Sequence, residues 1–270
     1  MTEAYDPVLV PQTYSELFAD WNRRPEAVPF AGGTALLGGR DGRKPKAPAA
    51  ILSLEKIEEM QRITRSERYL EIGATVKLSR IVELGKFVPG VLVKCLRSIA
   101  GPQLRNMATI GGNVCGFGDG VAAFTALDAQ YGLRSAQSSR WITASRFLPA
   151  PSPDALNPRE LLSRIRVPLD NWEYSTYKKF AGDRSAVFLA KPQKDVLADI
   201  RIVCKTGDRT WRNKDGETLL IGKRLPLTRR MAAAFVGRWE AFLRGAENAD
   251  GLSRKELVNF IETNVDNLAE

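Results

Sequence analysis

The chain has 270 residues, of which 44% are hydrophobic, so it is long enough to bury a substantial core and to form two domains. It contains no histidine, which excludes catalytic mechanisms in which a histidine activates a nucleophile. Its three cysteines are widely spaced, which argues against disulfide, zinc or iron–sulfur frameworks held by this chain alone. The formal net charge of +9 suits an anionic ligand or an acidic partner. Because the basic residues are scattered among acidic ones and lack interleaved aromatics, nucleic-acid binding is not expected.

The first third of the chain predicts a helix followed by short strands. Thr13 and Glu16 form a capping-box pattern, which starts a helix that Pro25 ends. Apolar runs predict strands within 27–33, 47–54 and 68–74, and the spacing of apolar residues within 75–87 predicts a helix. The N-terminal segment carries acidic residues where a secretory signal has basic ones, and the apolar runs are too short to span a membrane. We therefore expect a soluble, cytoplasmic protein.

The rest of the chain predicts two helices, a hairpin, a linker and then a different arrangement. The helices are expected at 89–100 and 121–130, the hairpin at 131–143 and a proline-rich linker at 147–158. Strands follow within 161–168, 173–180, 185–192 and 199–207, and helices are expected at 227–243 and from Ser253, which Glu256 completes as a second capping box. Strands followed by paired helices, without long crossover helices between parallel strands, indicate an α+β fold.

Two glycine segments carry the functional signal. The segment "AGGT" follows a predicted strand at Ala31–Thr34, and "TIGGN" occupies Thr109–Asn113. The stretch Gly33–Arg40 does not complete a Walker A loop, because Gly39 and Arg40 replace the required Lys and Ser/Thr, and the stretch Gly116–Val121 does not complete a dinucleotide fingerprint, because Val121 replaces its third glycine. Consecutive backbone N–H groups beside a threonine can form a concavity for a phosphate, although such glycines also occur in ordinary tight turns.

The order and spacing of "FAGGTALL", "LEIGATVKLSRIVE" and "IAGPQLRNMATIGGNVCG" resemble the FAD-binding flavoprotein (medium) subunit of the xanthine dehydrogenase and carbon monoxide dehydrogenase family of molybdenum hydroxylases. The resemblance covers about the first 165 residues and continues more loosely beyond them. It implies an α+β fold with a bipartite FAD-binding domain of the vanillyl-alcohol-oxidase (PCMH) type at 1–168, whose lobes are 1–55 and 56–168. A small C-terminal α+β domain would follow at 169–270.

The resemblance also implies which residues bind FAD, with no catalytic or metal-ligating residue in this chain. The first glycine segment would lie along the pyrophosphate and the second would close on the phosphates and ribitol, while residues from other parts of the chain would lie near the flavin or a sugar hydroxyl. The implied residues are Phe30, Ala31, Gly32, Gly33, Thr34, Ala35, Leu36, Ile99, Ala100, Ala108, Thr109, Gly112, Asn113, Cys115, Asp119, Ile165 and Lys178. Lys178 would stabilise the anionic reduced flavin, a role that the adjacent Lys179 could also fill.

As a function, the resemblance implies an electron-transfer subunit. Electrons from a molybdopterin centre on a large partner subunit would pass through [2Fe–2S] clusters on a small partner subunit to FAD, and then to NAD⁺ or another acceptor. A stand-alone flavin oxidoreductase is one alternative. A scaffold that has lost FAD is another, because Ala35 replaces the family's usual acidic residue and the loop between Cys115 and Asp119 is shorter than usual.

Overall fold

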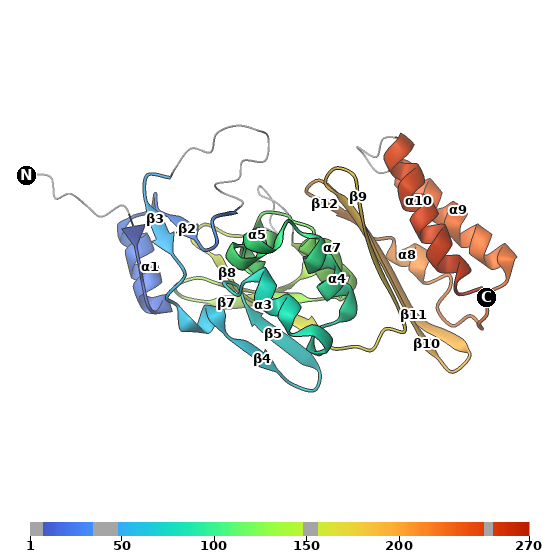
Figure 1. The fold of residues 1–270 in the computed structure, drawn as a ribbon, viewed down its shortest axis with the longest axis horizontal. Helices are drawn as coiled ribbons and strands as arrows, with labels where there is room; N and C mark the ends of the chain where they lie inside the picture. Colours follow the sequence, from blue (N-terminus) through green and yellow to red (C-terminus); the bar gives the residue numbers. More distant parts are fainter. Residues whose placement is uncertain (1–7, 35–47, 148–155, 246–250, 270) are drawn as a thin grey trace, which may run out of the picture. The chain divides into compact units, whose positions relative to one another are not determined.

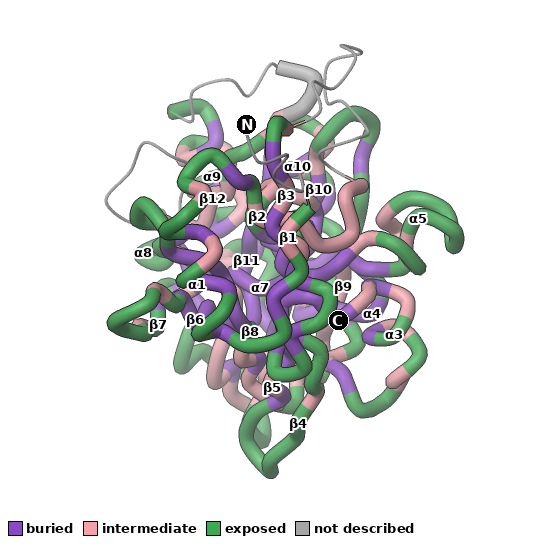
Figure 2. Tube along the Cα trace, turned by 90° about the vertical axis from the view of Figure 1, so that its left-hand side faces the viewer, coloured by how far each residue is buried: buried purple, intermediate pink, exposed green. Residues whose placement is uncertain are grey.

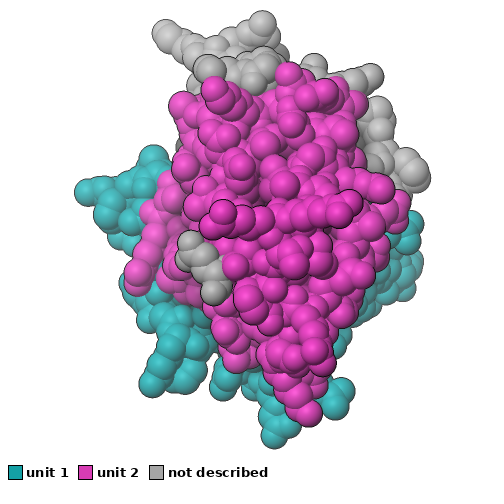
Figure 3. Space-filling model, turned by 90° about the vertical axis from the view of Figure 1, so that its right-hand side faces the viewer, with its two compact units in different colours: residues 1–88, 99–118, 128–169 teal, residues 89–98, 119–127, 170–270 magenta. Residues whose placement is uncertain are grey.

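The computed structural model describes residues 8–34, 48–147, 156–245 and 251–269 of the chain. The chain divides into two compact units (Figure 3). Unit 1 comprises residues 1–88, 99–118 and 128–169, and unit 2 comprises 89–98, 119–127 and 170–270. The domain and lobe limits expected from the sequence stay predictions.

Unit 1 begins with a small parallel sheet whose strand order is β1-β3-β2, formed by β1 (Val8–Leu9), β2 (Val28–Phe30) and β3 (Ile51–Ser53) (Figure 1). Helix α1 (Tyr14–Arg23) connects β1 to β2 and starts as predicted, since the Thr13 hydroxyl accepts a hydrogen bond from the Glu16 N–H at 3.2 Å. The parallel pairing was not anticipated. Two- and three-residue strands carry too little pattern to reveal their direction.

The larger sheet of unit 1 is antiparallel, with strand order β4-β5-β8-β6-β7. Its strands are β4 (Ile63–Arg65), β5 (Tyr69–Gly73), β6 (Gln130–Arg134), β7 (Ser139–Thr143) and β8 (Leu161–Pro168). The predicted hairpin at 131–143 is confirmed as β6 and β7. Figure 2 shows the buried stretches of the chain in purple and the exposed stretches in green. From Ser163 to Val167 of β8 the side chains alternate, because Ser163, Ile165 and Val167 are buried whereas Arg164 and Arg166 are not.

Helical segments of unit 1 connect these strands. They are the α-helices α3 (Leu78–Glu83), α5 (Pro102–Met107) and α6 (Ile110–Cys115) and the short 3₁₀ helices η1 (Glu58–Gln61), η2 (Gly85–Phe87) and η3 (Ala144–Arg146). The second glycine segment therefore does not form the loop that the sequence suggested. Thr109 caps it as the first turn of α6, because its hydroxyl accepts a hydrogen bond from the Gly112 N–H at 3.2 Å.

Unit 2 is built on an antiparallel sheet with strand order β12-β11-β10-β9. Its strands are β9 (Tyr174–Phe180), β10 (Arg184–Gln193), β11 (Val196–Thr206) and β12 (Arg209–Trp211). One face packs on α4 (Gly90–Ser98) and α7 (Gly120–Ala126). The other packs on α9 (Arg229–Gly245) and α10 (Gly251–Asp266), with α8 (Lys214–Glu217) beside β11.

The core of unit 2 explains this layering. Phe188 and Ile202 from the sheet bury themselves with Phe235 and Trp239 of α9, and the neighbouring residues along each strand face α4 and α7 instead. Helix α10 begins at Gly251, so the prediction of a cap at Ser253 is wrong. No helix in the described ranges is long and apolar enough to cross a membrane.

Candidate functional site

In unit 1 the first glycine segment packs against the residues just before the second. The first follows β2, and the second follows α5 and forms the cap and the first residues of α6. A Cβ added to Gly32 would lie 2.1 Å from the Met107 carbonyl oxygen and 3.1 Å from the Ala108 Cα, which leaves no room for a side chain. The backbone of the first segment therefore runs directly against the residues that precede the second.

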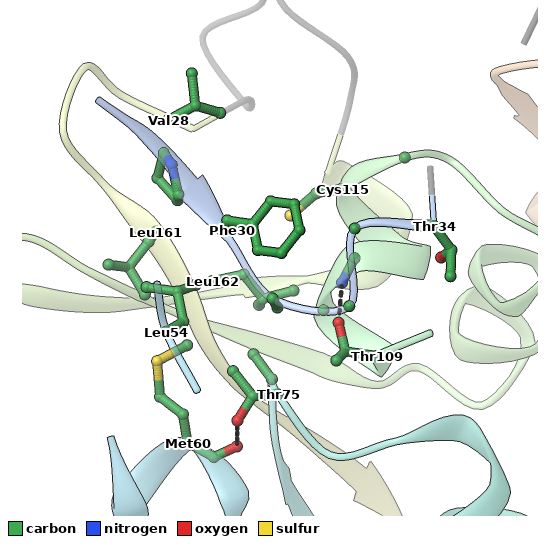
Figure 4. A pocket seen from close by; sticks show the side chains of 18 of the residues that line it. Val28, Phe30, Thr34, Leu54, Met60, Thr75, Thr109, Cys115, Leu161 and Leu162 are labelled. Atoms are coloured by element: carbon green, nitrogen blue, oxygen red, sulfur yellow. Dashed lines mark hydrogen bonds between the residues drawn. The ribbon is translucent and has the colours of Figure 1, made fainter. Parts of the chain in front are cut away.

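A cavity of about 550 Å³ opens beside this contact and is lined by both segments. Figure 4 shows apolar side chains on one side of it and Thr34, Thr109 and Cys115 on the other. The labelled apolar residues are Val28, Phe30, Leu54, Met60, Leu161 and Leu162. A cavity of this size and lining accepts part of a large organic ligand that carries an apolar ring.

The first glycine segment offers unused hydrogen-bond donors. No hydrogen bond within the described part of the chain involves the backbone N–H groups of Ala31, Gly32, Gly33 and Thr34. Gly33 has a φ of +68°, a left-handed conformation that glycine adopts at little cost. Four consecutive free donors beside a cavity suit an anionic group such as a phosphate.

The second segment differs, because protein groups already use most of its donors. The Ile110 N–H donates to the Val76 carbonyl at 2.9 Å, and the Gly111 N–H donates to the Ala74 carbonyl at 2.8 Å. The Gly112 N–H donates to the Thr109 hydroxyl oxygen. The sequence-based expectation of consecutive free N–H groups in this segment is therefore wrong, because these bonds anchor α6 onto residues 74–76. The hydroxyl proton of Thr109 still has no acceptor among the described residues.

Glycines 111 and 112 serve different purposes. A Cβ on Gly111 would lie 2.7 Å from the Ala74 Cβ, so this glycine permits the close packing of α6. Gly112 is exposed on the cavity wall, and a Cβ there would have the Thr109 hydroxyl at 3.0 Å as its neighbour. Gly112 therefore keeps the cavity open rather than allowing two parts of the chain to pack.

Glu160 is the charged residue among the described lining residues of the cavity. Its two carboxylate oxygens accept hydrogen bonds at 2.7 Å from Nε and Nη2 of Arg140, and Oε2 also accepts the Asn157 N–H at 2.9 Å. Burial by itself would raise the pKa of Glu160, but the Arg140 and Asn157 hydrogen bonds outweigh it and lower the pKa below 4.5. The ionised pair closes one wall of the cavity and joins β7 to the start of β8.

This pair predicts a pH-dependent contribution to stability. Because the pKa of Glu160 is lower in the folded state, the stabilisation is present above the unfolded value of 4.5 and is lost as the pH falls through the folded value. We expect Glu160→Gln to lower the free energy of unfolding by about 1–2 kcal/mol near neutral pH and by much less below about pH 3. Urea denaturation at the two pH values measures the difference.

Glu58→Gln is the control for this prediction, because the side chain of Glu58 is 82% exposed in its pair with Arg62. It should leave the free energy of unfolding nearly unchanged at both pH values. An equal loss for Glu160→Gln at neutral and acidic pH would contradict the pairing as the source of the stabilisation.

Other predicted site residues of unit 1 lie outside the lining of this cavity. Ile99 and Ala100 form the turn before α5, where Nη1 of Arg105 donates to both of their carbonyl oxygens. Ile165 is fully buried in β8 between Ile72 and Tyr131. Ala108 and Asn113 flank the lining residues Thr109 and Gly112. Ala35 and Leu36 lie outside the described residues.

Two predicted residues belong to unit 2. Asp119, 6% exposed, forms an ion pair with Lys179 in which Oδ2 lies 2.8 Å from Nζ, and its Oδ1 has no hydrogen-bond partner among the described residues. Lys178 instead places Nζ 5.3 Å from the centre of the Phe180 ring. The two lysines thus face opposite sides of β9, and the flavin role of either stays a prediction.

Sequence reasoning missed several lining residues. Leu54, Met60, Thr75, Leu161 and Leu162 come from segments that carry no glycine signal. Their apolar pattern is the one that any buried strand or turn shows, so it does not mark a cavity. Glu160 was missed because an acidic residue after a proline-rich stretch resembles a surface position.

Comparisons with known proteins agree on the family. Residues 3–170 match the family described as "FAD binding domain in molybdopterin dehydrogenase". The chain is 30% identical over 209 residues to the glyceraldehyde dehydrogenase medium chain of Sulfolobus acidocaldarius, covering 73% of this chain and 74% of that one. It is 33% identical over 146 residues to the nicotinate dehydrogenase FAD-subunit of Eubacterium barkeri, where the match takes in 51% of this chain and 48% of that subunit.

A solved structure shows the same fold over nearly the whole chain. The reconstituted CO dehydrogenase from Oligotropha carboxidovorans contains a chain that superposes with a TM-score of 0.80. The superposition covers 99% of this chain and 97% of that one, at 21% sequence identity. The expected α+β architecture is confirmed.

Proposed function

Because the chain belongs to the family of FAD-binding domains of molybdopterin dehydrogenases, an oxidoreductase family, we propose that it is the FAD-binding, electron-transfer subunit of a multi-subunit molybdenum hydroxylase. The observation that carries the proposal is the apolar cavity that both glycine segments line, beside the close approach of Gly32 to Met107 and Ala108. Family membership indicates that the cofactor is FAD. The cavity and the glycine segments beside it offer positions for a phosphate group and for an aromatic ring.

The residues present fit FAD. The free N–H groups of Ala31–Thr34 would donate to phosphate oxygens, and the Thr109 hydroxyl would donate from the opposite segment. The apolar wall around Leu54 and Leu162 would exclude water from a ring of the cofactor. FAD, when bound, accepts and releases electrons singly or in pairs, which is the chemistry that this chain's side chains lack.

The remaining residues of the proposed site come from the family resemblance. Ile99, Ala100 and Ile165 would pack near the flavin, Asp119 would accept a hydrogen bond from a sugar hydroxyl, and Lys178 or Lys179 would stabilise negative charge on the reduced ring. An ion-paired Lys179 still carries its positive charge, so the pair with Asp119 is compatible with either assignment.

The proposed electron path involves two partner chains. A large subunit would hold molybdopterin and a small subunit would hold [2Fe–2S] clusters that deliver electrons to FAD, with NAD⁺ or another compound as acceptor. Two relatives are named a medium chain and an FAD-subunit, which supports a multi-chain assembly. A stand-alone flavin oxidoreductase would need none of these partners, and a scaffold would need no flavin.

Purification from the native source tests the proposal. We expect a yellow protein that releases FAD on denaturation, in a ratio of one flavin to each chain, together with larger and smaller chains that carry molybdenum and iron. FAD without metals or partners would favour the stand-alone oxidoreductase. A colourless protein that cannot be reconstituted with FAD would contradict the proposal and favour the scaffold.

A further inference from the structure

A second, smaller cleft adjoins the apolar cavity in unit 1. Its volume is about 90 Å³, and it shares Ala31, Thr75 and Thr109 with the cavity. Unlike the cavity, it is lined by charged and polar side chains, namely Glu55, Gln61, Lys77 and Arg80. Ala31 belongs to the first glycine segment and Thr109 to the second. The polar cleft therefore borders the place where Gly32 packs against Met107 and Ala108.

Lys77 lies at that contact. Its Nζ donates to the Met107 carbonyl oxygen at 3.3 Å, and this is the same oxygen that the backbone of Gly32 approaches closely. The backbone of Lys77 also forms an antiparallel bridge with Thr109, which fixes where its side chain starts. The ammonium group is therefore held beside both glycine segments.

Arg80 adds a second positive charge to the polar cleft. Its Nη1 donates to the Gln61 carbonyl oxygen at the long distance of 3.4 Å. Neither Lys77 nor Arg80 forms an ion pair with any carboxylate of the described residues, although Glu55 lines the same cleft. Counting Glu55, the three charged side chains of the cleft sum to one positive charge.

Positive charge beside the glycine segments favours a diphosphate. This group carries two negative charges, and the backbone donors of Ile110 and Gly111 that would otherwise serve it are bonded to Val76 and Ala74. The free N–H groups of the first segment and the Thr109 hydroxyl are neutral donors, and ammonium and guanidinium groups add stronger, charge-assisted hydrogen bonds to phosphate.

We propose that Lys77 and Arg80 bind the diphosphate of FAD in the polar cleft, where they act together with the free N–H groups of the first glycine segment and the Thr109 hydroxyl. This inference rests on the proposed function, since FAD is the ligand assumed. The positive charge that binds the phosphates would then come from residues 77–80 at the start of α3, outside both glycine segments.

The test is a titration of flavin-free full-length protein with FAD, followed by flavin fluorescence. We expect Lys77→Gln and Arg80→Gln each to weaken FAD binding about tenfold, and the double variant about a hundredfold. Glu55→Gln removes the opposing charge and should tighten binding by roughly threefold, an effect that a merely structural role would not produce. The double variant should also show a shallower dependence of FAD affinity on KCl concentration.

Lys86→Gln and Arg68→Gln are the matched controls, because both residues are exposed and neither lines the polar cleft or the cavity. Their FAD affinity should equal that of the wild type. Unchanged affinity and salt dependence in the double variant would overturn the inference while leaving the proposed function intact.

Inorganic pyrophosphate separates the two possible failures. If the wild type does not bind FAD, the proposed function fails, but the polar cleft is still tested by comparing pyrophosphate binding in the wild type and the double variant by calorimetry. Weaker pyrophosphate binding in the double variant supports the phosphate site, and equal binding overturns it. Weaker pyrophosphate binding with unchanged FAD affinity would assign the cleft to a different phosphate ligand and overturn the inference as stated.

Discussion

Gly32→Ala is expected to abolish FAD retention and to lower the free energy of unfolding by about 3 kcal/mol. The added methyl group would lie 2.1 Å from the Met107 carbonyl oxygen, which belongs to the backbone and has little freedom to move. The first glycine segment would have to move away from Met107 and Ala108, and Ala31 of this segment lines both the polar cleft and the cavity. Flavin absorbance after gel filtration and urea denaturation measure the two effects.

Gly90→Ala is the control for this substitution, since a Cβ on Gly90 meets nothing within 4 Å. It should retain wild-type FAD content and stability. A Gly32→Ala protein with normal stability would contradict the close contact of the segments. A destabilised variant that still retains FAD would support the contact and contradict its role in holding the cofactor.

Gly112→Val is expected to weaken FAD binding by at least about a hundredfold while lowering the free energy of unfolding by no more than about 2 kcal/mol. Gly112 lies in the first turn of α6 and is exposed on the cavity wall, so the valine side chain would occupy space proposed for the cofactor. The fold should survive, because valine costs no more than glycine in a helix, and moving the Thr109 hydroxyl from its position at 3.0 Å would cost only the one hydrogen bond that caps α6. Parallel FAD titration and urea denaturation separate the two quantities.

Gly237→Val provides the comparison, because Gly237 lies in α9 and a Cβ there meets nothing within 4 Å. This variant should bind FAD normally. Gly111→Ala should show the opposite profile to Gly112→Val, with a loss of stability from the contact with Ala74. Wild-type affinity in Gly112→Val would show that the cavity wall at this position does not contact the cofactor.

Much of the fold follows from local sequence signals. The Thr13 cap and the β6–β7 hairpin each depend on residues within a few positions of one another, and the structure confirms both. The predicted start of α10 was wrong, and the parallel pairing of β1, β3 and β2 was not predicted. In both places the local sequence pattern is too short to decide the structure. Element boundaries and strand direction depend on partners that are remote in the sequence.

The residues of the candidate site likewise fall into two groups, those that local sequence signals identify and those that such signals do not. The two glycine segments were identifiable because glycine marks close approach of backbone wherever it occurs in clusters. Glu160, Leu54 and Met60 were not identifiable, because a buried leucine or a paired glutamate looks the same in the sequence whether or not a cavity lies beside it.

The sequence by itself determined the family, the α+β class and the two places where backbone would approach a ligand or another part of the chain. Only the tertiary structure decided which of those backbone groups remain available. The N–H of Gly111 is used by the carbonyl of Ala74, whereas no described residue accepts from the N–H of Gly32. A hydrogen bond between residues so far apart in the chain depends on how α6 docks onto the end of β5, and no local sequence pattern encodes that docking.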